Sequence, residues 1–260
     1  MGSTKVTGAW PSRVAVVTGA AGAIGSAIAV RLARAGNHVI VTDLDEEGAR
    51  SVVERIGQIG YGATAMGLDV GSASAISAFF ATLDDTFGRC DILINNAAVA
   101  SIRPFVDYPE DTWQRILDIN LTGPMLLAQQ AVARMKRAGW GRVVNIASIS
   151  GIRAGVGRSG YGTSKAALIA LTRQIAVELA TDGITVNAVA PGPIETALAK
   201  SLHSASARKA YLRQVPMRRY GSPDEVAAAV AFFSAEDSAY ITGQTLAVDG
   251  GFVVAGMLDA

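Results

Sequence analysis

The chain contains, at residues 14–25, the run VAVVTGAAGAIG, and a helical pattern of apolar residues follows at 27–33. The β-branched first part predicts a buried strand, and the second part predicts a glycine-rich turn into a helix. Glycines let the backbone approach a pyrophosphate, and the free N–H groups and dipole of a helix start receive its charge. The run therefore predicts the phosphate cradle of a dinucleotide fold. The residues expected to contact the dinucleotide here are Gly19, Gly22, Ala23, Ile24 and Gly25.

A second apolar run, residues 39–42, ends in Asp43, twenty-four residues after Gly19. In dinucleotide-binding folds an acid at about this spacing bonds the ribose hydroxyls of the adenosine. A 2′-phosphate at the same place would meet the negative charge of Asp43, and the next residues, Leu44 and Asp45, carry no positive charge to relieve the repulsion. The sequence therefore predicts NAD rather than NADP as the cofactor, with Asp43 and Leu44 at its adenosine end.

Strand and helix signals alternate along the rest of the chain without a linker or a repeat. Further short apolar runs occupy residues 63–68, 92–95, 143–147, 185–190 and 245–248. Buried strands separated by helical stretches are typical of a parallel sheet covered on both faces. We predict an α/β fold, a Rossmann-like doubly wound sheet of seven parallel strands, in a single domain of residues 1–260. The polar stretch 195–216 follows a strand end, where ligands bind, and we interpret it as a substrate lid.

Tyr161 and Lys165 stand four residues apart, which places them on one face of a helix. A free tyrosine has a pKa of about 10, and a positive charge roughly 6 Å away would lower it by about two units. Ser148, thirteen residues before Tyr161, could orient a substrate oxygen whose proton the phenol removes or supplies. The three residues predict an acid-base device.

From about residue 12 to residue 252 the chain resembles the short-chain dehydrogenase/reductase family, whose motifs it carries in order. The motifs are the glycine loop 19–25, Asp69-Val70, Asn95-Asn96-Ala97-Ala98, Asn120, Ser148, Tyr161 with Lys165, Pro191-Gly192-Pro193-Ile194-Glu195-Thr196, and Asp249-Gly250-Gly251. Two residues depart from the family pattern. Ala23 stands at the middle glycine of the loop, and Ala98 stands where the asparagine motif usually ends in glycine.

The resemblance implies a role for each motif. Tyr161 would be the general acid/base and Ser148 would hold the reacting oxygen. Lys165 would also bond the nicotinamide ribose, and Asn120 would hold a water that relays the proton to solvent. On the cofactor side, Asp69 would receive the adenine amino group, Asn96 would support the backbone, and Ile194 with Thr196 would clamp the carboxamide. The full set implied for this side is Asp69, Val70, Asn96, Ala97, Ala98, Tyr161, Lys165, Pro191, Gly192, Ile194 and Thr196.

The substrate pocket is expected between residues 98–103, 150–158, 191–193 and the lid. Ser150, Arg153 and Arg158 are the candidate substrate residues, and with Arg103 nearby the arginines suggest an anionic group. Solvated arginines, or arginines in subunit contacts, are an equally good interpretation.

Three functions remain open. The leading hypothesis is an NAD-dependent dehydrogenase for a secondary alcohol on a small polar substrate, such as a polyol, sugar or hydroxy acid. The second is a 3-oxoacyl-thioester reductase, against which Asp43 counts because reductive biosynthesis usually draws on NADPH. The third, a non-catalytic NAD-binding protein, is opposed by the intact set of Asn120, Ser148, Tyr161 and Lys165.

Composition limits the partners. A net charge of +1 gives no electrostatic footprint for nucleic acid. We expect no membrane span because no apolar stretch approaches about 20 residues. The first thirteen residues lack the apolar core of a secretory signal, and a single cysteine, Cys90, fits a reducing compartment, so we expect a cytoplasmic protein. We expect no metal site.

The resemblance also implies a homotetramer. The helical stretches 111–137 and 161–180 carry small residues suited to packing between subunits, and the chain ends in the apolar run 252–258. The small residues are Ala128, Ala131, Ala166, Ala167 and Ala170.

Overall fold

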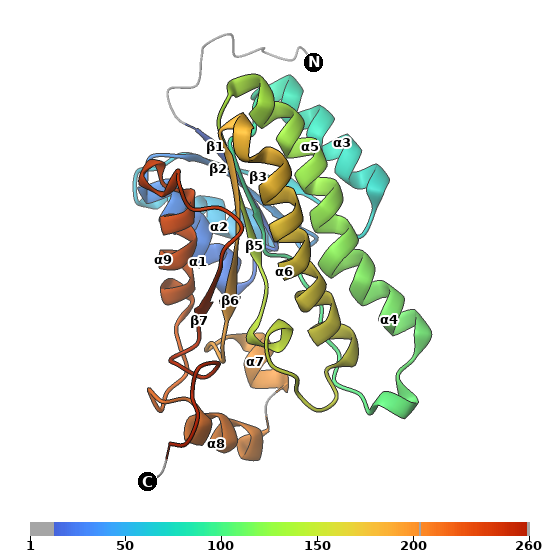
Figure 1. The fold of residues 1–260 in the computed structure, drawn as a ribbon. Coiled ribbons are helices and arrows are strands. Elements are labelled where there is room, and N and C mark those ends of the chain that lie inside the picture. Colours follow the sequence, from blue (N-terminus) through green and yellow to red (C-terminus); the bar gives the residue numbers. More distant parts are fainter. Residues whose placement is uncertain (1–12, 203, 259–260) are drawn as a thin grey trace.

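The computed structural model describes residues 13–202 and 204–258 (Figure 1). Its strands are β1 (Val14–Thr18), β2 (His38–Asp43), β3 (Ala63–Gly67), β4 (Ile92–Asn95), β5 (Gly141–Ile146), β6 (Ile184–Pro191) and β7 (Thr245–Val248). They form one seven-stranded sheet in the order β3-β2-β1-β4-β5-β6-β7, and every pairing is parallel. The predicted Rossmann-like sheet is confirmed.

The order in which successive strands are added to the sheet reverses at β1. This strand pairs with β2 on one side, where Val16 lies opposite Ile40, and with β4 on the other, where Val16 lies opposite Leu93. All five residues of β1 are buried, which explains why its sequence is continuously apolar and not alternating. In open α/β sheets ligands bind beyond the carboxyl ends of the strands at such a switch point.

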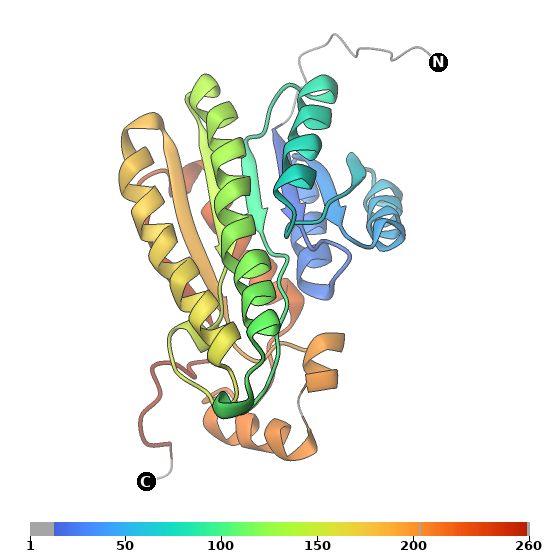
Figure 2. The same ribbon diagram turned by 90° about the vertical axis from the view of Figure 1, so that its right-hand side faces the viewer.

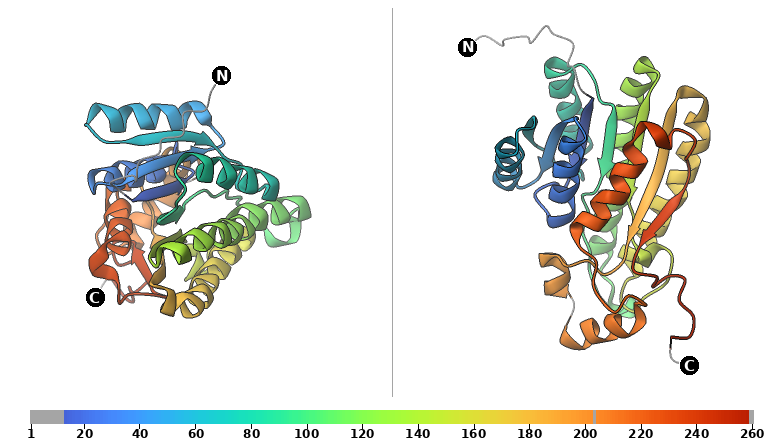
Figure 3. Two further views of the ribbon diagram at one scale, coloured as in Figure 1. Left: turned by 90° about the horizontal axis from the view of Figure 1, so that it is seen from above. Right: turned by 90° about the vertical axis from the view of Figure 1, so that its left-hand side faces the viewer.

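Helices cover both faces of the sheet (Figure 1; Figure 3, right). One face carries α1 (Ala23–Arg34), α2 (Glu46–Gln58) and α9 (Pro223–Ser234), and the other carries α3 (Ala73–Thr86), α5 (Gly123–Ala138) and α6 (Ser159–Leu179). Each layer has its own apolar core: Ile28 and Val230 lie in the first, and Phe80 and Leu127 in the second. Short 3₁₀ turns lie at Phe105–Asp107, Ile149–Gly151, Ala180–Asp182 and Glu236–Ser238.

The predicted helical stretch 111–137 is divided in three. After α4 (Glu110–Leu117) comes a π-helical turn (Asp118–Thr122), and α5 then begins. Pro124 has no N–H to give to the carbonyl of Asn120, four residues earlier, so the α-helical ladder is interrupted at this point. The interruption lies in the turn before the Gly123-Pro124 pair, and it turns Asn120 into the interior, where it is fully buried.

The predicted lid region consists of two short helices, α7 (Ala197–Leu202) and α8 (Ala205–Gln214). They lie beyond the carboxyl edge of the sheet, apart from the two helical layers (Figure 2). Their short length explains the weak periodicity of the sequence there. The structure places this segment over the strand ends, and its movement as a lid stays a prediction.

Two of the small residues proposed for packing between subunits lie in the core of the chain itself. Ala128 and Ala131 are buried in the chain's own core between α5 and the sheet, so they are not available to a partner. On α6, Ala166 and Ala170 are exposed. No helix in the described part of the chain combines the length and apolar character needed to cross a membrane. Residues 1–12, on which the expectation about a secretory signal rested, lie outside the described residues.

Candidate active site

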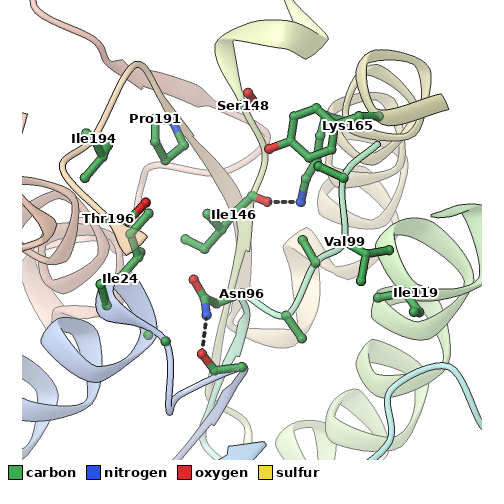
Figure 4. Close-up of a pocket in the computed structure, with 18 of the residues that line it drawn as sticks. Ile24, Asn96, Val99, Ile119, Ile146, Ser148, Lys165, Pro191, Ile194 and Thr196 are labelled. Carbon is green, nitrogen blue, oxygen red and sulfur yellow. Dashed lines mark hydrogen bonds between the residues drawn. The ribbon is translucent and has the colours of Figure 1, made fainter. Parts of the chain in front are cut away.

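A cleft of about 680 Å³ opens at the carboxyl edge of the sheet. Every residue predicted for the cofactor side lines this cleft, from the glycine loop through Asp43 and Asn96 to Thr196. Ser148, Ser150 and Arg158 also lie on its wall. In Figure 4, Pro191, Ile194 and Thr196 stand on one side of the cleft and Val99 and Ile119 on the other. Residues from the whole length of the chain therefore meet in one hollow.

The glycine loop packs too closely for side chains. Gly19 has φ +63°, and a Cβ on it would lie 2.7 Å from the Cα of Ala97. A Cβ on Gly25 would lie 2.3 Å from the carbonyl oxygen of Gly19. The N-cap residue of α1 is Gly22, so no side chain accepts a hydrogen bond from the first N–H groups of the helix. The first turn of α1 contains no acidic residue. The helix N–H groups thus face the cleft without a competing anion, and the loop fits a pyrophosphate.

Asn96 holds this loop in place. Its Nδ2 donates to the carbonyl oxygen of Thr18 at 2.8 Å. The same nitrogen donates to the carbonyl oxygen of Gly19 at 3.0 Å (Figure 4). In return, Thr18 Oγ1 accepts from the backbone N–H groups of Asn96 and Ala97 at 3.0 and 3.1 Å. These contacts are the backbone support implied by the resemblance. Ala98 replaces a glycine at no conformational cost, because Arg218 is the only non-glycine with positive φ among the described residues.

Asp43 joins the end of β2 to the glycine loop. Its Oδ2 accepts from the N–H of Ala21 at 2.9 Å, and its Oδ1 accepts from the N–H of Asp45 at 3.1 Å. A carboxylate has about four acceptor positions, so it can bond ribose hydroxyls as well. Asp69 also has two tasks: it lines the cleft, and its Oδ1 accepts from the N–H of Gly71 at 2.8 Å, which forms a turn.

The acid-base residues come from β5 and α6. Ser148 lies just beyond β5, and its hydroxyl accepts from the N–H of Ser150 at 3.1 Å and hydrogen-bonds with Tyr161. Lys165 is 2% exposed, and its Nζ donates to the carbonyl oxygen of Ile146 at 2.7 Å (Figure 4). The same Nζ lies 5.8 Å from the ring centroid of Tyr161. The helical spacing has brought phenol and amine together as predicted.

The predicted effect of Lys165 on Tyr161 was wrong. Burial raises the pKa of Tyr161, and the hydrogen bond with Ser148 and the charge of Arg158 oppose that rise. Burial also lowers the pKa of Lys165 to about 7. Lys165 is therefore not the permanent positive charge that the sequence argument assumed. That argument used spacing and charge alone and omitted the cost of removing both groups from water.

Asn120 stands behind the cleft wall. Its Oδ1 accepts from the N–H of Val99 at 2.9 Å, and its Nδ2 donates to the carbonyl of Val99 at 2.9 Å and to Ser164 Oγ at 3.1 Å. Ser164 Oγ in turn donates to the carbonyl of Tyr161 at 2.8 Å. The side-chain amide thus ties the loop after β4 to the helix that carries Tyr161. This geometry makes Asn120 a positioning residue, and its part in a water relay stays a prediction.

Only two of the three predicted substrate residues reach the cleft. Ser150 and Arg158 line the cleft, but Arg153 does not. Arg153 Nη1 donates to the carbonyl of Phe252 at 2.7 Å, and its guanidinium lies 4.9 Å from the Phe252 ring centroid. Sequence reasoning placed it with Arg158 because both lie in one loop, while the side chains leave that loop in different directions.

Val99 and Tyr211 lie in stretches expected to line the pocket but were not singled out, and Ile119 was missed. Tyr211 of α8 lines the cleft, and its hydroxyl accepts from Arg158 Nη2 at 3.2 Å. No local pattern marks this tyrosine. Val99 and Ile119 also line the cleft. Val99 falls in the expected stretch 98–103, whereas Ile119 stands next to Asn120 and lay in no expected stretch.

The comparisons with known proteins agree with this geometry. A family model described as Enoyl-(Acyl carrier protein) reductase matches residues 19–253. The 3-oxoacyl-(acyl-carrier-protein) reductase FabG of Aquifex aeolicus is 40% identical over 241 residues, which cover 92% of this chain and 96% of the relative. The enzyme of the same name from Vibrio cholerae is 41% identical over 239 residues, with the same coverage. The chain belongs to the short-chain dehydrogenase/reductase family.

Solved structures place this family member beside sugar-acid enzymes as well. A candidate gluconate dehydrogenase from Agrobacterium tumefaciens superposes with a TM-score of 0.91 at 32% identity, covering 97% of this chain and all of the other. A candidate NAD(P)-dependent gluconate 5-dehydrogenase from Beutenbergia cavernae, with bound NADP at low occupancy, gives 0.88 at 34% identity and covers 98% of this chain and all of the other. This short-chain dehydrogenase/reductase is an oxidoreductase that uses a nicotinamide cofactor and acts on CH–OH groups.

Proposed function

We propose that this enzyme is an NAD-dependent dehydrogenase that interconverts a secondary alcohol and a ketone on a small polar substrate, namely a polyol, sugar or hydroxy acid. The observation that carries the choice of NAD is Asp43. Its carboxylate lies on the cleft wall at the end of β2 and is held there by two backbone N–H groups. A 2′-phosphate would bring its own negative charge against this carboxylate, whereas ribose hydroxyls would donate to it.

The chemistry divides between cofactor and chain. A bound nicotinamide would be held by Lys165, Ile194 and Thr196, and it would supply the carbon that accepts a hydride from the alcohol. As the alcohol is oxidised, its hydroxyl proton would pass to the phenolate form of Tyr161 and the C=O bond would form; reduction would reverse both transfers. Ser148 and Arg158 favour this phenolate against the opposing effect of burial on the Tyr161 pKa. Ser148 hydrogen-bonds the same substrate oxygen and so fixes it beside the phenol. Lys165, held by the Ile146 carbonyl, stands next to Tyr161, and Asn120 positions the helix that carries both.

The 3-oxoacyl-thioester reductase is the second candidate, because relatives with 40% and 41% sequence identity are named 3-oxoacyl-(acyl-carrier-protein) reductases. Two observations favour the small polar substrate. Asp43 disfavours NADP, and the gluconate dehydrogenase candidates superpose over nearly the whole chain. A non-catalytic NAD-binding protein has the least support, because Ser148, Tyr161 and Lys165 meet on one wall of the cleft.

A substrate panel distinguishes these candidates. Absorbance at 340 nm is followed with NAD and, separately, with NADP across polyols, aldonates, other hydroxy acids and 3-hydroxyacyl thioesters. We expect turnover with NAD on a polyol or hydroxy acid. Turnover restricted to thioesters with NADP would establish the second candidate, and NAD binding without turnover of any of these compounds would favour the third.

We also propose that the enzyme is a homotetramer in the cytoplasm, as the family resemblance implies. The exposed Ala166 and Ala170 on α6 leave a smooth helix face that suits close packing. Light scattering at micromolar protein should give about four times the monomer mass of 26.8 kDa. A monomer mass would reject the assembly.

A further inference from the structure

Among the described residues, the charged side chains that line the cleft are three carboxylates and three basic residues. Among the described residues that line it, the carboxylates Asp43, Asp45 and Asp69 follow β2 and β3, at the adenosine end. Of the basic residues, Arg115 belongs to α4, and Arg158 and Lys165 stand beside the reacting hydroxyls of Ser148 and Tyr161. Both of these residues are cationic in their protonated forms. A site with one sign of charge between low-dielectric walls favours a ligand group of the opposite sign. The substrate end therefore suits an anion.

The Arg158 side chain is directed into this end by its surroundings. Its residue caps the start of α6, three positions before Tyr161, and its carbonyl accepts from the N–H of Gly162 at 2.6 Å. Gly155 approaches its stem so closely that a Cβ there would lie 3.1 Å from Arg158 Cδ. The guanidinium then reaches Tyr211 across the cleft at 3.2 Å. Its charge is also felt at the Tyr161 phenol, whose pKa it lowers.

Tyr211 is held by a stack of side chains behind it. Its ring centroid lies 6.1 Å from that of Tyr220 in an edge-on arrangement and 5.9 Å from that of Phe252. The Arg153 guanidinium lies over the Phe252 ring. The phenol position is therefore set by packing, and a phenolic hydroxyl can both accept and donate a hydrogen bond.

We propose that Arg158 and the Tyr211 hydroxyl together bind the carboxylate of the substrate, which makes the substrate a hydroxy acid and not a neutral polyol or a thioester. The proposal rests on the proposed dehydrogenase function and specifies its substrate class. Guanidinium N–H groups bind a carboxylate through charge-assisted hydrogen bonds, and a phenolic O–H adds one more donor. One guanidinium with one hydroxyl matches a monoanion. Arg153 does not bind the carboxylate itself. It is a positioning residue that holds Phe252, which in turn packs against Tyr211.

The test compares an acid with a neutral compound of the same chain length. Steady-state kinetics with NAD are measured for gluconate against sorbitol, and for shorter aldonates and hydroxy acids against the matching polyols. We expect the native enzyme to prefer an acid by about 10-fold or more in kcat/KM. Arg158→Gln should raise KM for that acid by about 10-fold or more, change KM for the polyol by less than about 2-fold, and leave KM for NAD unchanged.

Three further variants separate charge from structure. Arg158→Lys should keep part of the preference because the charge remains, and Tyr211→Phe should raise KM for the acid by about 3-fold or more while kcat changes little. Arg103→Gln is the matched control, since Arg103 is an exposed arginine of the neighbouring loop that does not line the cleft. This control should leave the preference intact.

The outcomes separate the inference from the function. NAD-linked turnover of polyols without any preference for acids, or an equal loss on both in Arg158→Gln, would overturn the inference and leave the dehydrogenase standing. If no compound turns over, calorimetry of the same acids with the enzyme–NAD complex still decides. Binding that disappears in Arg158→Gln would support the carboxylate site, whereas no binding, or binding that survives the substitution, would refute it.

Discussion

The two ends of the cleft are built in opposite ways. The cofactor end consists of backbone turns that follow neighbouring strands, and these turns bond directly to one another through Asn96 and Asp43. The substrate end includes long side chains from distant segments, such as Arg158 and Tyr211, which meet through their tips. The Phe252 ring packs against Tyr211. Substitutions at the cofactor end should alter backbone conformation and protein stability. Substitutions at the substrate end should alter substrate specificity.

The difference follows from what each end must bind. A dinucleotide is always the same ligand, so rigid backbone with glycines at close contacts serves it best. The substrate differs between relatives with this fold, and side chains can be exchanged without disturbing the strands beneath them. The catalytic residues Ser148, Tyr161 and Lys165 stand at the border between the two ends.

The largest effect is expected at this border. Tyr161→Phe removes one oxygen and should lower kcat by about 10² to 10⁴, the span of a lost general acid/base. NADH affinity, measured by fluorescence titration, should stay close to that of the native enzyme because the cofactor end is untouched. Tyr240→Phe, at a fully exposed tyrosine, is the control. Unchanged turnover in the Tyr161 variant would show that another group moves the proton.

Substitutions of Asp43 test whether its charge or its hydrogen bonds to the backbone contribute more to cofactor binding. The native enzyme should prefer NAD over NADP by at least about 10² in kcat/KM, equivalent to roughly 2.7 kcal/mol. Asp43→Asn keeps one acceptor for the loop but removes the charge, so most of that preference should disappear. Asp43→Ala should also lose NAD affinity, since the bonds to Ala21 and Asp45 go as well. A native enzyme that uses NADP equally well would contradict the assignment of NAD.

A pair of glycines tests the rigidity of the phosphate loop. Gly25→Ala places a methyl 2.3 Å from the Gly19 carbonyl oxygen, and we expect a loss of about 1–3 kcal/mol in unfolding free energy together with weaker NAD binding. Gly57→Ala, on helix α2, meets nothing within 4 Å and should stabilise the protein by about 0.5–1 kcal/mol. Urea denaturation measures both. Equal effects would mean that the loop adapts more easily than its contacts indicate.

The last test concerns the buried amine at the border. Burial lowers the pKa of Lys165 from 10.5 to about 7, so above pH 7 the unfolded chain binds a proton that the folded chain has released. The contribution of Lys165 to unfolding free energy should therefore rise between pH 7 and about 10.5, by at most about 1.4 kcal/mol per pH unit. The native protein should gain stability over Lys165→Met as pH rises through this window.

Denaturation at pH 7, 8 and 9 measures that gap. Lys209→Met removes an exposed lysine and controls for the loss of charge. A gap between native protein and Lys165→Met that stays constant with pH would show that Lys165 is solvated in the folded chain.

Much of the cofactor end could be predicted from sequence. The strand before Gly19, the glycine turn, and the acid at Asp43 are each defined by a few neighbouring residues, and the structure brings all of them to the cleft. The helical spacing of Tyr161 and Lys165 was also sufficient to place them side by side. Backbone conformation and helical periodicity are local properties, so a local pattern carries them.

Only the tertiary structure decided the remaining features. It shows that Arg153 leaves the cleft for Phe252 while Arg158 enters it, and that Tyr211 arrives from α8 to meet Arg158. It also reverses the expected shift in the Tyr161 pKa, because desolvation depends on every segment packed around a group. Strands, turns and the spacing of the catalytic pair were determined by sequence because short-range geometry produces them. The partners and charge states of side chains were decided by the folded structure, since they depend on residues far apart in the chain.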